Sequence, residues 1–270
     1  MKKDTIGTRM KENYENRSKT YLTRRCPAII RIDGKAFHTF TKGFKKPYDE
    51  IFHKAMNETM RYLCKNIQGC KIGYTQSDEI SLLLTDYETI TTDAWFDYSV
   101  QKMCSVSASL ATFAFNRYFA KFAREYTENP DIFVSANSDE DVKQNKENCK
   151  YALTLINAID KGALFDSRCF SIPADEVVNC FIWRQQDATK NAISMLARCY
   201  FSDKQCHDKN GSELQDMLMD EYKVNFNDMP IEYKRGVCCI RTENGWKIDK
   251  EIPVFTDIHS IESGVELISK

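Results

Sequence analysis

Three acidic residues stand at positions where the chain is expected to turn. Asp33 and Gly34 end the apolar run at 28–30, and Asp78 and Glu79 interrupt a second pair of apolar runs. Asp is unfavourable inside a strand, whereas Asp-Gly at a strand end places a carboxylate at the sheet edge beside a tight turn. An ordinary turn gives the same pattern, so the chemical interpretation depends on whether the fold brings the two acidic positions together.

Carboxylates that converge from separate strands are what a two-metal phosphoryl-transfer site needs. Mg²⁺ prefers oxygen ligands, and two ions about 3.5–4 Å apart hold the attacking and leaving oxygens of such a reaction. The Gly34 carbonyl is a further candidate ligand, because a glycine allows close approach to the backbone. Like charges at Asp33, Asp78 and Glu79 would repel each other without a cation, which also favours a metal site.

The elements around these residues follow the order strand, helix, strand, strand, helix, strand. The strands are expected at 27–33, 70–76, 80–85 and 164–173, and the helices at 48–66 and 95–126. This βαββαβ order is typical of a ferredoxin-like α+β fold, in which the first and third strands are neighbours. The topology therefore predicts that Asp33 meets the hairpin tip that carries Asp78 and Glu79.

The remaining segments form an extension to this unit. They are helices at 175–200 and 212–222, a strand at 236–241, a turn at Asn244-Gly245 and a polar, loop-rich stretch at 129–148. We expect the βαββαβ unit, which carries the acidic residues, to occupy 1–172 and an extension of helices and short strands to occupy 173–270, packed on each other as one compact body.

Composition limits the class of protein. The chain has 270 residues, of which 42% are hydrophobic, and a net charge of −1 from 38 basic and 39 acidic residues. These values allow an apolar core, whereas the bulk charge does not indicate nucleic-acid binding. No apolar run approaches the length of a membrane span and the N-terminal stretch is polar, which predicts a cytoplasmic protein with no membrane partner.

The eleven cysteines include no CxxC pair. Without a secretory signal they are expected to be reduced thiols. Cys238-Cys239 and the set Cys199, Cys206 and His207 lack a second half at ligand spacing, so the sequence predicts no zinc site.

Several motifs, in order along most of the chain, resemble the tRNA-histidine guanylyltransferase superfamily. They are RIDG-x-x-FH-x-F at 31–40, KP-x-D-E at 46–50, GY-x-QSDE-x-S at 73–81, WF at 95–96 with Lys102, FD-x-R at 165–168, WRQ-x-D at 183–187 and N-x-x-P…Y-K-R-G at 227–236. The resemblance implies a polymerase-type palm that adds nucleotides to the 5′ end of tRNA, the reverse of the ordinary polymerase direction.

The resemblance also implies roles for individual residues. Asp33, the Gly34 carbonyl and Asp78 would hold two Mg²⁺ ions, with Glu79 also needed for activity. Nucleotide binding is implied for Lys35, Ala36, Phe37, His38, Lys46 and Ser77, and at a further triphosphate for Arg31 and Lys102. tRNA binding is implied for Arg184, Asn191, Lys234 and Arg235, although packing of the helix is the alternative for Arg184. ATP, GTP and other nucleoside triphosphates would be substrates together with tRNA, and the family precedent is a homotetramer.

Two departures from the family pattern bear on specificity. After Trp95-Phe96, histidine-specific members carry basic residues, whereas this chain has Asp97, Tyr98 and Ser99. After WRQ-x-D, a motif associated with reading the histidine anticodon is replaced by the stretch at 188–194, which keeps one Asn, Asn191, and no His. The chain therefore resembles the guanylyltransferase-like branch, whose members repair truncated tRNA 5′ ends with the opposite strand as template.

Three other functions remain open at this point. Strict guanylate addition to tRNA-His is the alternative within the family, and a palm-type nucleotide cyclase would use a nucleoside triphosphate alone. A tRNA-binding module without catalysis is disfavoured, because all three acidic residues are present. Phosphoryl transfer depends on positioning and charge neutralisation, which fits a site of carboxylates without a protein nucleophile.

Overall fold

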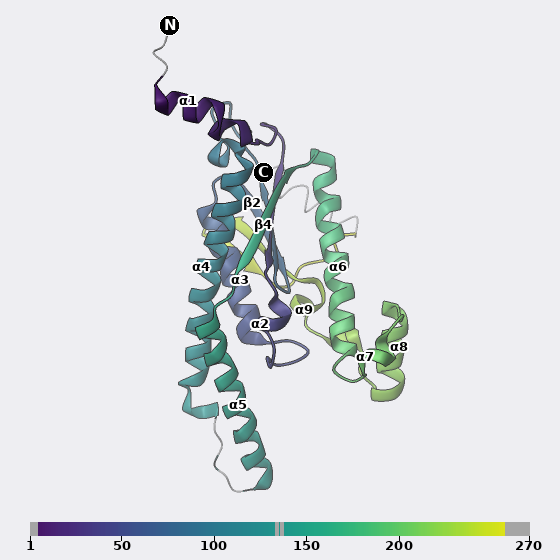
Figure 1. The fold of residues 1–270 in the computed structure, drawn as a ribbon. Helices are drawn as coiled ribbons and strands as arrows, with labels where there is room; N and C mark the ends of the chain where they lie inside the picture. Colours follow the sequence, from purple (N-terminus) through teal and green to yellow (C-terminus); the bar gives the residue numbers. More distant parts are fainter. Residues whose placement is uncertain (1–4, 133–134, 136–137, 257–270) are drawn as a thin grey trace.

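The fold is a twisted antiparallel sheet with helices on both faces (Figure 1). The structure is a computed structural model that describes residues 5–132, 135 and 138–256. In the described residues the strand order is β4-β1-β3-β2-β5-β6. The strands are β1 (Ala28–Gly34), β2 (Cys70–Gln76), β3 (Glu79–Leu84), β4 (Phe165–Ser171), β5 (Val237–Thr242) and β6 (Gly245–Asp249).

Helices cover both faces of the sheet, and α1 (Ile6–Asn13) extends beyond it (Figure 1). In the described residues the other α-helices are α2 (Phe37–Phe40), α3 (Glu50–Asn66), α4 (Val100–Thr127), α5 (Asp139–Lys161), α6 (Val177–Ala197), α7 (Asp203–Cys206), α8 (Gly211–Tyr222) and α9 (Ile231–Arg235). Figure 1 shows α3 and α4 on one face, α6 on the other, and α5 alongside the far part of α4. In the described part of the chain, no helix is long and apolar enough to cross a membrane.

Strand alternation decides which face carries the acidic positions. Ile30 and Ile32 of β1 belong to the large apolar core beneath α3 and α4, whereas Ile29 packs with Phe181 of α6. Successive side chains of a strand point to opposite faces. Arg31 and Asp33 therefore share the face that α6 covers.

The predicted βαββαβ arrangement is confirmed, including the central pair of strands. β1 pairs with β3 on one side and with β4 on the other, and β2 and β3 form the expected hairpin. The strand expected near 236–241 is β5, which joins the edge of β2, and the turn after it leads into β6, which the sequence did not predict. These two strands extend the sheet. The division of the chain at residue 172 stays a prediction.

The prediction of loops over 129–148 is wrong, because α5 begins at Asp139. The Ser138 hydroxyl accepts a hydrogen bond from the Asp141 backbone N–H and caps the helix. Only Tyr151, Leu155 and Ala158 of this helix are buried, and most of its other residues are polar because they face solvent. A mostly solvated helix shows a narrow apolar stripe, which a scan for apolar content misses.

The helix expected over 95–126 begins later than predicted. Trp95–Tyr98 forms a 3-10 turn, and Phe96, Asp97 and Tyr98 all have positive φ angles near 50–56°. Residues other than Gly seldom adopt this left-handed backbone. The segment before α4 is therefore a tight turn that other residues must hold in place.

Candidate active site

The three acidic residues meet at one end of the central strand pair. Asp33 of β1 lies opposite Glu79 of β3 in the antiparallel register. The Gly34 N–H donates to the Asp78 carbonyl at 3.1 Å, which ties the end of β1 to the hairpin tip. Ser77, at this tip, has a φ of 49° and turns the chain tightly between β2 and β3. The predicted convergence of the carboxylates is thus present.

A pocket of about 780 Å³ opens beside these strand ends. Nine of the residues predicted for metal, nucleotide or tRNA binding line it: Asp33, Gly34, Ala36, Phe37, His38, Lys46, Ser77, Asp78 and Asn191. They come from β1, the turn into α2, the loop before α3, the hairpin tip and α6. A concave site that gathers polar groups from several elements is typical of a small-molecule site.

Aromatic side chains form the far wall of the pocket. The rings of Tyr48 and Tyr233 stack with centroids 4.1 Å apart, and His53 meets Tyr233 edge-on at 4.7 Å. Burial lowers the pKa of His53 to about 4, so this imidazole is neutral at pH 7. The sequence analysis did not select these three residues. Tyr233 belongs to the Y-K-R-G motif, so a signal for it was available. Tyr48 stands at the unspecified position of KP-x-D-E, and His53 lies outside the motifs.

The acidic end of the pocket disfavours further negative charge. Burial raises the pKa of Asp78, and the neighbouring Asp33 carboxylate raises it further. Burial also raises the pKa of Glu79, an effect that the charges of Arg184 and Arg31 oppose. A cation near Asp33 and Asp78 would relieve the repulsion between these two carboxylates.

The donor set suits Mg²⁺ rather than a softer metal. In the described residues, no three His, Cys, Asp or Glu side chains gather closely enough to hold a metal alone. Two carboxylates, Asp33 and Asp78, and the Gly34 carbonyl are present at one strand end. Mg²⁺ is usually bound through one or two carboxylates and takes its other ligands from water and substrate phosphates. The residues therefore fit a magnesium site that is completed by a nucleotide.

Gly34 is required by close packing. A Cβ atom at this position would lie 2.2 Å from the Phe37 ring, which is far inside van der Waals contact. Phe37 in turn is buried against Phe40, Phe115 and Phe165 and has no room to move away. The backbone at Gly34 is thus fixed by the core beneath it.

The turn after β1 exposes only part of the predicted nucleotide cradle. The Lys35 N–H already donates to the Leu164 carbonyl at 2.8 Å. The next amides, at Ala36, Phe37 and His38, open the short helix α2, and the first turn of a helix leaves amides without intrahelical partners. Lys35 itself lines a separate hollow of about 510 Å³ on the other side of the turn.

Two cationic residues predicted to bind a further triphosphate lie outside the pocket. Arg31 precedes Asp33 by two residues on β1. Its guanidinium lies 5.2 Å from the centroid of the Trp183 ring. Lys102, near the start of α4, lies 5.7 Å from the Phe96 ring centroid. Two residues further on, Cys104 contacts Cys169 in the middle of β4, so Lys102 lies toward the opposite end of the sheet from Asp33.

The predicted tRNA contacts are dispersed. Arg184 is 7% exposed and is paired with Glu79 and Asp187, so it faces the sheet rather than solvent. The Lys234 ammonium donates to the Asn227 carbonyl, and Arg235 donates to the Ile252 carbonyl. Of the four residues, Asn191 alone lines the pocket.

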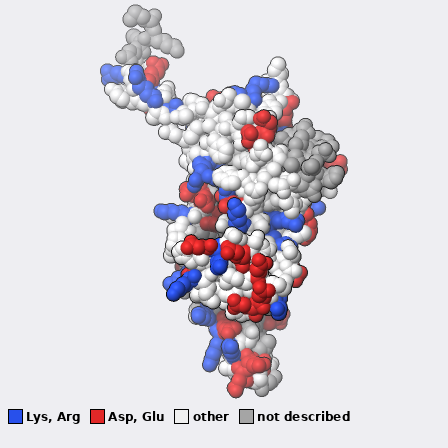
Figure 2. All heavy atoms as spheres, turned by 90° about the vertical axis from the view of Figure 1, so that its right-hand side faces the viewer, with Lys and Arg blue, Asp and Glu red and all other residues white. Residues whose placement is uncertain are grey.

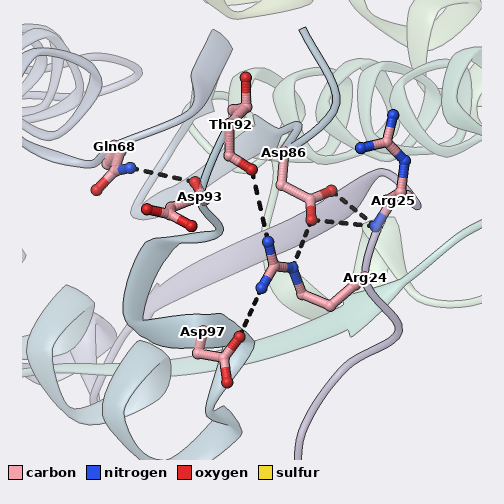
Figure 3. Close-up of polar contacts among 7 residues, drawn as sticks. All are labelled: Arg24, Arg25, Gln68, Asp86, Thr92, Asp93 and Asp97. Atoms are coloured by element: carbon pink, nitrogen blue, oxygen red, sulfur yellow. Dashed lines mark hydrogen bonds and ion pairs between the residues drawn. The ribbon is translucent and has the colours of Figure 1, made fainter. Parts of the chain in front are cut away.

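Asp97, which stands where histidine-specific members carry a basic residue, forms an ion pair within the chain (Figure 3). Arg24 donates from Nη1 to Asp97 at 2.6 Å and from Nε to the buried Asp86 carboxylate at 2.7 Å. Asp86 also accepts the Arg25 backbone N–H at 2.9 Å. This cluster fixes the left-handed turn at 96–98 from a segment far away in sequence.

Comparison with known proteins identifies relatives with the same fold. The family model described as tRNAHis guanylyltransferase matches residues 7–173. A solved bacterial tRNA(His) guanylyltransferase-like protein in complex with ATP is 41% identical with a TM-score of 0.80, and the match covers 98% of this chain and 100% of that one. A solved bacterial protein of the same description in complex with GTP is 38% identical with a TM-score of 0.75, covering 99% and 100% of the two chains.

A yeast relative gives the same assignment. The tRNA(His) guanylyltransferase of Saccharomyces cerevisiae is 26% identical over 225 residues, which cover 78% of this chain and 81% of the yeast protein. The family model spans well over half of the chain and includes β1 to β4. The chain therefore belongs to the tRNAHis guanylyltransferase family, a family of nucleotidyltransferases.

Proposed function

We propose that the chain adds nucleotides to the 5′ end of tRNA in the 3′-to-5′ direction and repairs 5′-truncated tRNA with the opposite strand as template. The observation that supports this most is the pocket that combines Asp33 and Asp78 with the turn from Gly34 to His38. Relatives of similar fold that are described in complex with ATP and with GTP support a nucleoside triphosphate in such a pocket.

The chain's own residues bind and orient the triphosphate. The amides of Ala36, Phe37 and His38 donate to phosphate oxygens, as successive amides in a turn can. The Lys46 ammonium, at the rim of the pocket, adds a mobile positive charge. Ser77, which also lines the pocket, would contact the nucleotide through its hydroxyl.

Asp33, Asp78 and the Gly34 carbonyl would hold the magnesium ions, which supply charge neutralisation at the reacting phosphates when bound. The Glu79 carboxylate, on the strand opposite Asp33, is the third negative charge at this end of the sheet. Phosphoryl transfer then depends on alignment within this group rather than on a protein nucleophile.

The reaction takes two balanced steps. An oxygen of the tRNA 5′-monophosphate attacks the α-phosphorus of ATP, and pyrophosphate leaves as the adenylated 5′ end forms. The 3′-hydroxyl of the incoming nucleotide then attacks the tRNA 5′-phosphorus and loses its proton, and AMP leaves. The incoming nucleotide keeps its own triphosphate, which becomes the new 5′ end of the tRNA.

Surface charge restricts the path of the tRNA. Figure 2 shows acidic side chains gathered over the region of α7 and α8, where α8 contributes Glu213, Asp216, Asp220 and Glu221. An RNA backbone would be repelled from this face. The cationic rim of the pocket, with Lys42 and Lys46, offers the acceptor stem a favourable approach.

Pairing with the opposite strand would select the base. The stretch at 188–194 lacks the His and Tyr of the anticodon-reading motif. Its Asn191 shares the pocket with Asp33 and Asp78 and would act near the nucleotide. The homotetramer and the cytoplasmic location stay predictions.

A labelling experiment separates this function from its alternatives. The purified chain is incubated with unlabelled ATP, an α-³²P-labelled complementary nucleoside triphosphate and Mg²⁺, with and without a tRNA that carries a 5′-monophosphate and lacks its 5′ nucleotide. We expect labelled tRNA to form when the truncated tRNA is present, and no labelled product without it. A cyclic nucleotide formed without tRNA would indicate a cyclase, and no product under either condition would indicate a binding module.

The matched pair for this experiment is Asp33→Asn and Asp216→Asn. Both changes remove one carboxylate, but Asp216 lies on the exposed acidic helix α8. We expect the first variant to lose activity and the second to keep it. Equal activity of both variants would remove Asp33 from the site.

A further inference from the structure

Arg184 of α6 forms two short ion pairs, one with Glu79 beside the acidic strand ends and one with Asp187 on its own helix. Its Nε atom lies 2.8 Å from Glu79 Oε1, and its Nη2 atom lies 2.6 Å from Asp187 Oδ2. The Arg184 side chain is 7% exposed and that of Glu79 is 12% exposed. The pair is therefore largely shielded from solvent. At the low dielectric of such a site, the attraction between the guanidinium and the carboxylate is stronger than at the surface, and its geometry is held more firmly.

Glu79 is in a position where its orientation affects the site. It follows Asp78 directly and lies opposite Asp33 in the register of β1 and β3. By strand alternation its side chain points to the face that α6 covers, as does that of Asp33. A guanidinium fixed on α6 thus decides which way this carboxylate turns.

The ring of Trp183 supports the same arrangement. The Arg184 guanidinium lies 4.3 Å from the centroid of this ring and the Arg31 guanidinium 5.2 Å from it. Both cations also act electrostatically on Glu79. An Arg can stack on a ring while its planar fork holds two carboxylates, whereas a Lys offers a single point charge.

We infer that Arg184 is a positioning residue that fixes the Glu79 carboxylate for nucleotide addition, rather than a contact to tRNA. The inference rests on the proposed function and assigns the C-terminal helix α6 a part in the reaction. Arg184 acts only through Glu79. Its removal should therefore cost no more once Glu79 has been neutralised.

A double-mutant cycle tests this dependence. Initial rates are measured for the wild type, Glu79→Gln, Arg184→Met and the double variant, over a range of tRNA concentrations. We expect each single change to lower kcat by at least tenfold with an unchanged KM for tRNA, and the double variant to match the single variants within about threefold. Arg184→Lys should restore part of kcat. A rise in KM for tRNA at constant kcat, or losses that multiply, would overturn the inference.

Lys190→Met supplies the contrast, because Lys190 is exposed on the same helix. This change removes a positive charge from the exposed surface of α6, away from the ion pair between Arg184 and Glu79, and should leave kcat nearly constant. Arg184→Met must behave differently from it if Arg184 acts through Glu79.

Unfolding measurements keep the test independent of catalysis. The same four proteins should show a coupling of at least tenfold in the unfolding equilibrium constant, because each partner is buried against the other. A wild type that adds no nucleotide would overturn the proposed function, and the absence of coupling would overturn the inference separately. If Arg184→Met does not fold, Arg184→Lys and Asp187→Asn complete the comparison of kcat with KM.

Discussion

Asp33 and Glu79 lie directly opposite each other on antiparallel strands, and the Gly34 N–H bonds to the carbonyl of Asp78 beside them. The backbone hydrogen bonds of the sheet therefore set the spacing of the acidic residues. The positions of the acidic residues depend on the backbone at this end of the sheet. Changes to that backbone should therefore affect activity as strongly as changes to the carboxylates.

Gly34→Ala should abolish nucleotide addition. The new methyl group would collide with the Phe37 ring, so the strand end must shift and its carbonyl with it. Overpacking of this kind costs about 1–3 kcal/mol in the free energy of unfolding. We expect activity to fall at least a hundredfold while the protein stays folded at 25 °C, as judged by circular dichroism.

Gly7→Ala is the matched control for this change, because nothing lies within 4 Å of a Cβ atom built there. This variant should keep wild-type activity. Full activity of Gly34→Ala would show that the backbone at this position does not need to stay where the structure has it.

Asp86→Ala should destabilise the protein without touching the pocket. The Asp86 carboxylate is fully buried and accepts hydrogen bonds from Arg24 and from the Arg25 N–H. Loss of these charge-assisted bonds is expected to lower the free energy of unfolding by about 2–3 kcal/mol, as measured by urea denaturation. Asp93→Ala should have little effect, since Asp93 contributes its backbone carbonyl to Gln68 and keeps it in the variant. Equal stability of the two variants would contradict the role of Asp86.

His53 should make stability depend on pH. The folded pKa is about 4 and the ordinary value is 6.5, so between these values the unfolded chain binds a proton that the folded chain does not. The free energy of unfolding should therefore fall as the pH is lowered from 6.5 toward 4, by up to about 1.4 kcal/mol for each pH unit. Above pH 6.5 His53 is neutral in both states and makes no pH-dependent difference. His53→Gln should flatten this part of the stability curve in calorimetry at several pH values.

His207→Gln provides the comparison, because the His207 side chain is 74% exposed. This variant should keep the wild-type slope between pH 4 and 6.5. An unchanged slope in His53→Gln would mean that His53 titrates normally in the folded protein.

The anticodon should matter little to the rate. The stretch at 188–194 offers no His or Tyr to stack on exposed bases, and Asn191 faces the pocket. Several 5′-truncated tRNAs should each be extended by the complementary nucleotide. Transfer of the histidine anticodon into a poor substrate should change the rate by less than about tenfold, or 1.4 kcal/mol. A hundredfold gain would instead indicate histidine-specific recognition.

Local patterns predicted strands β1 to β5 of the sheet and the meeting of the carboxylates, because apolar runs that end in Asp-Gly or Ser-Asp mark strand ends. They did not predict α5, whose few buried residues leave a weak apolar signal. The pairs Arg184–Glu79 and Arg24–Asp86 could not be predicted either. Their partners are far apart in sequence, and only the packing of α6 and of the N-terminal segment on the sheet brings them together. Charged residues in such pairs look like surface residues until the fold is known.

The fate of the γ-phosphate of the incoming nucleotide tests the proposed direction of synthesis most directly. The wild type is given a truncated tRNA with a 5′-monophosphate, unlabelled ATP and the complementary γ-³²P-labelled nucleotide, and the tRNA is recovered within the first turnover. Attack by the 3′-hydroxyl of the nucleotide leaves its triphosphate intact. The label should therefore appear on the 5′ end of the tRNA, and Asp78→Asn should prevent it. Release of the label as pyrophosphate with the nucleotide added at the 3′ end of the tRNA would contradict the proposed function.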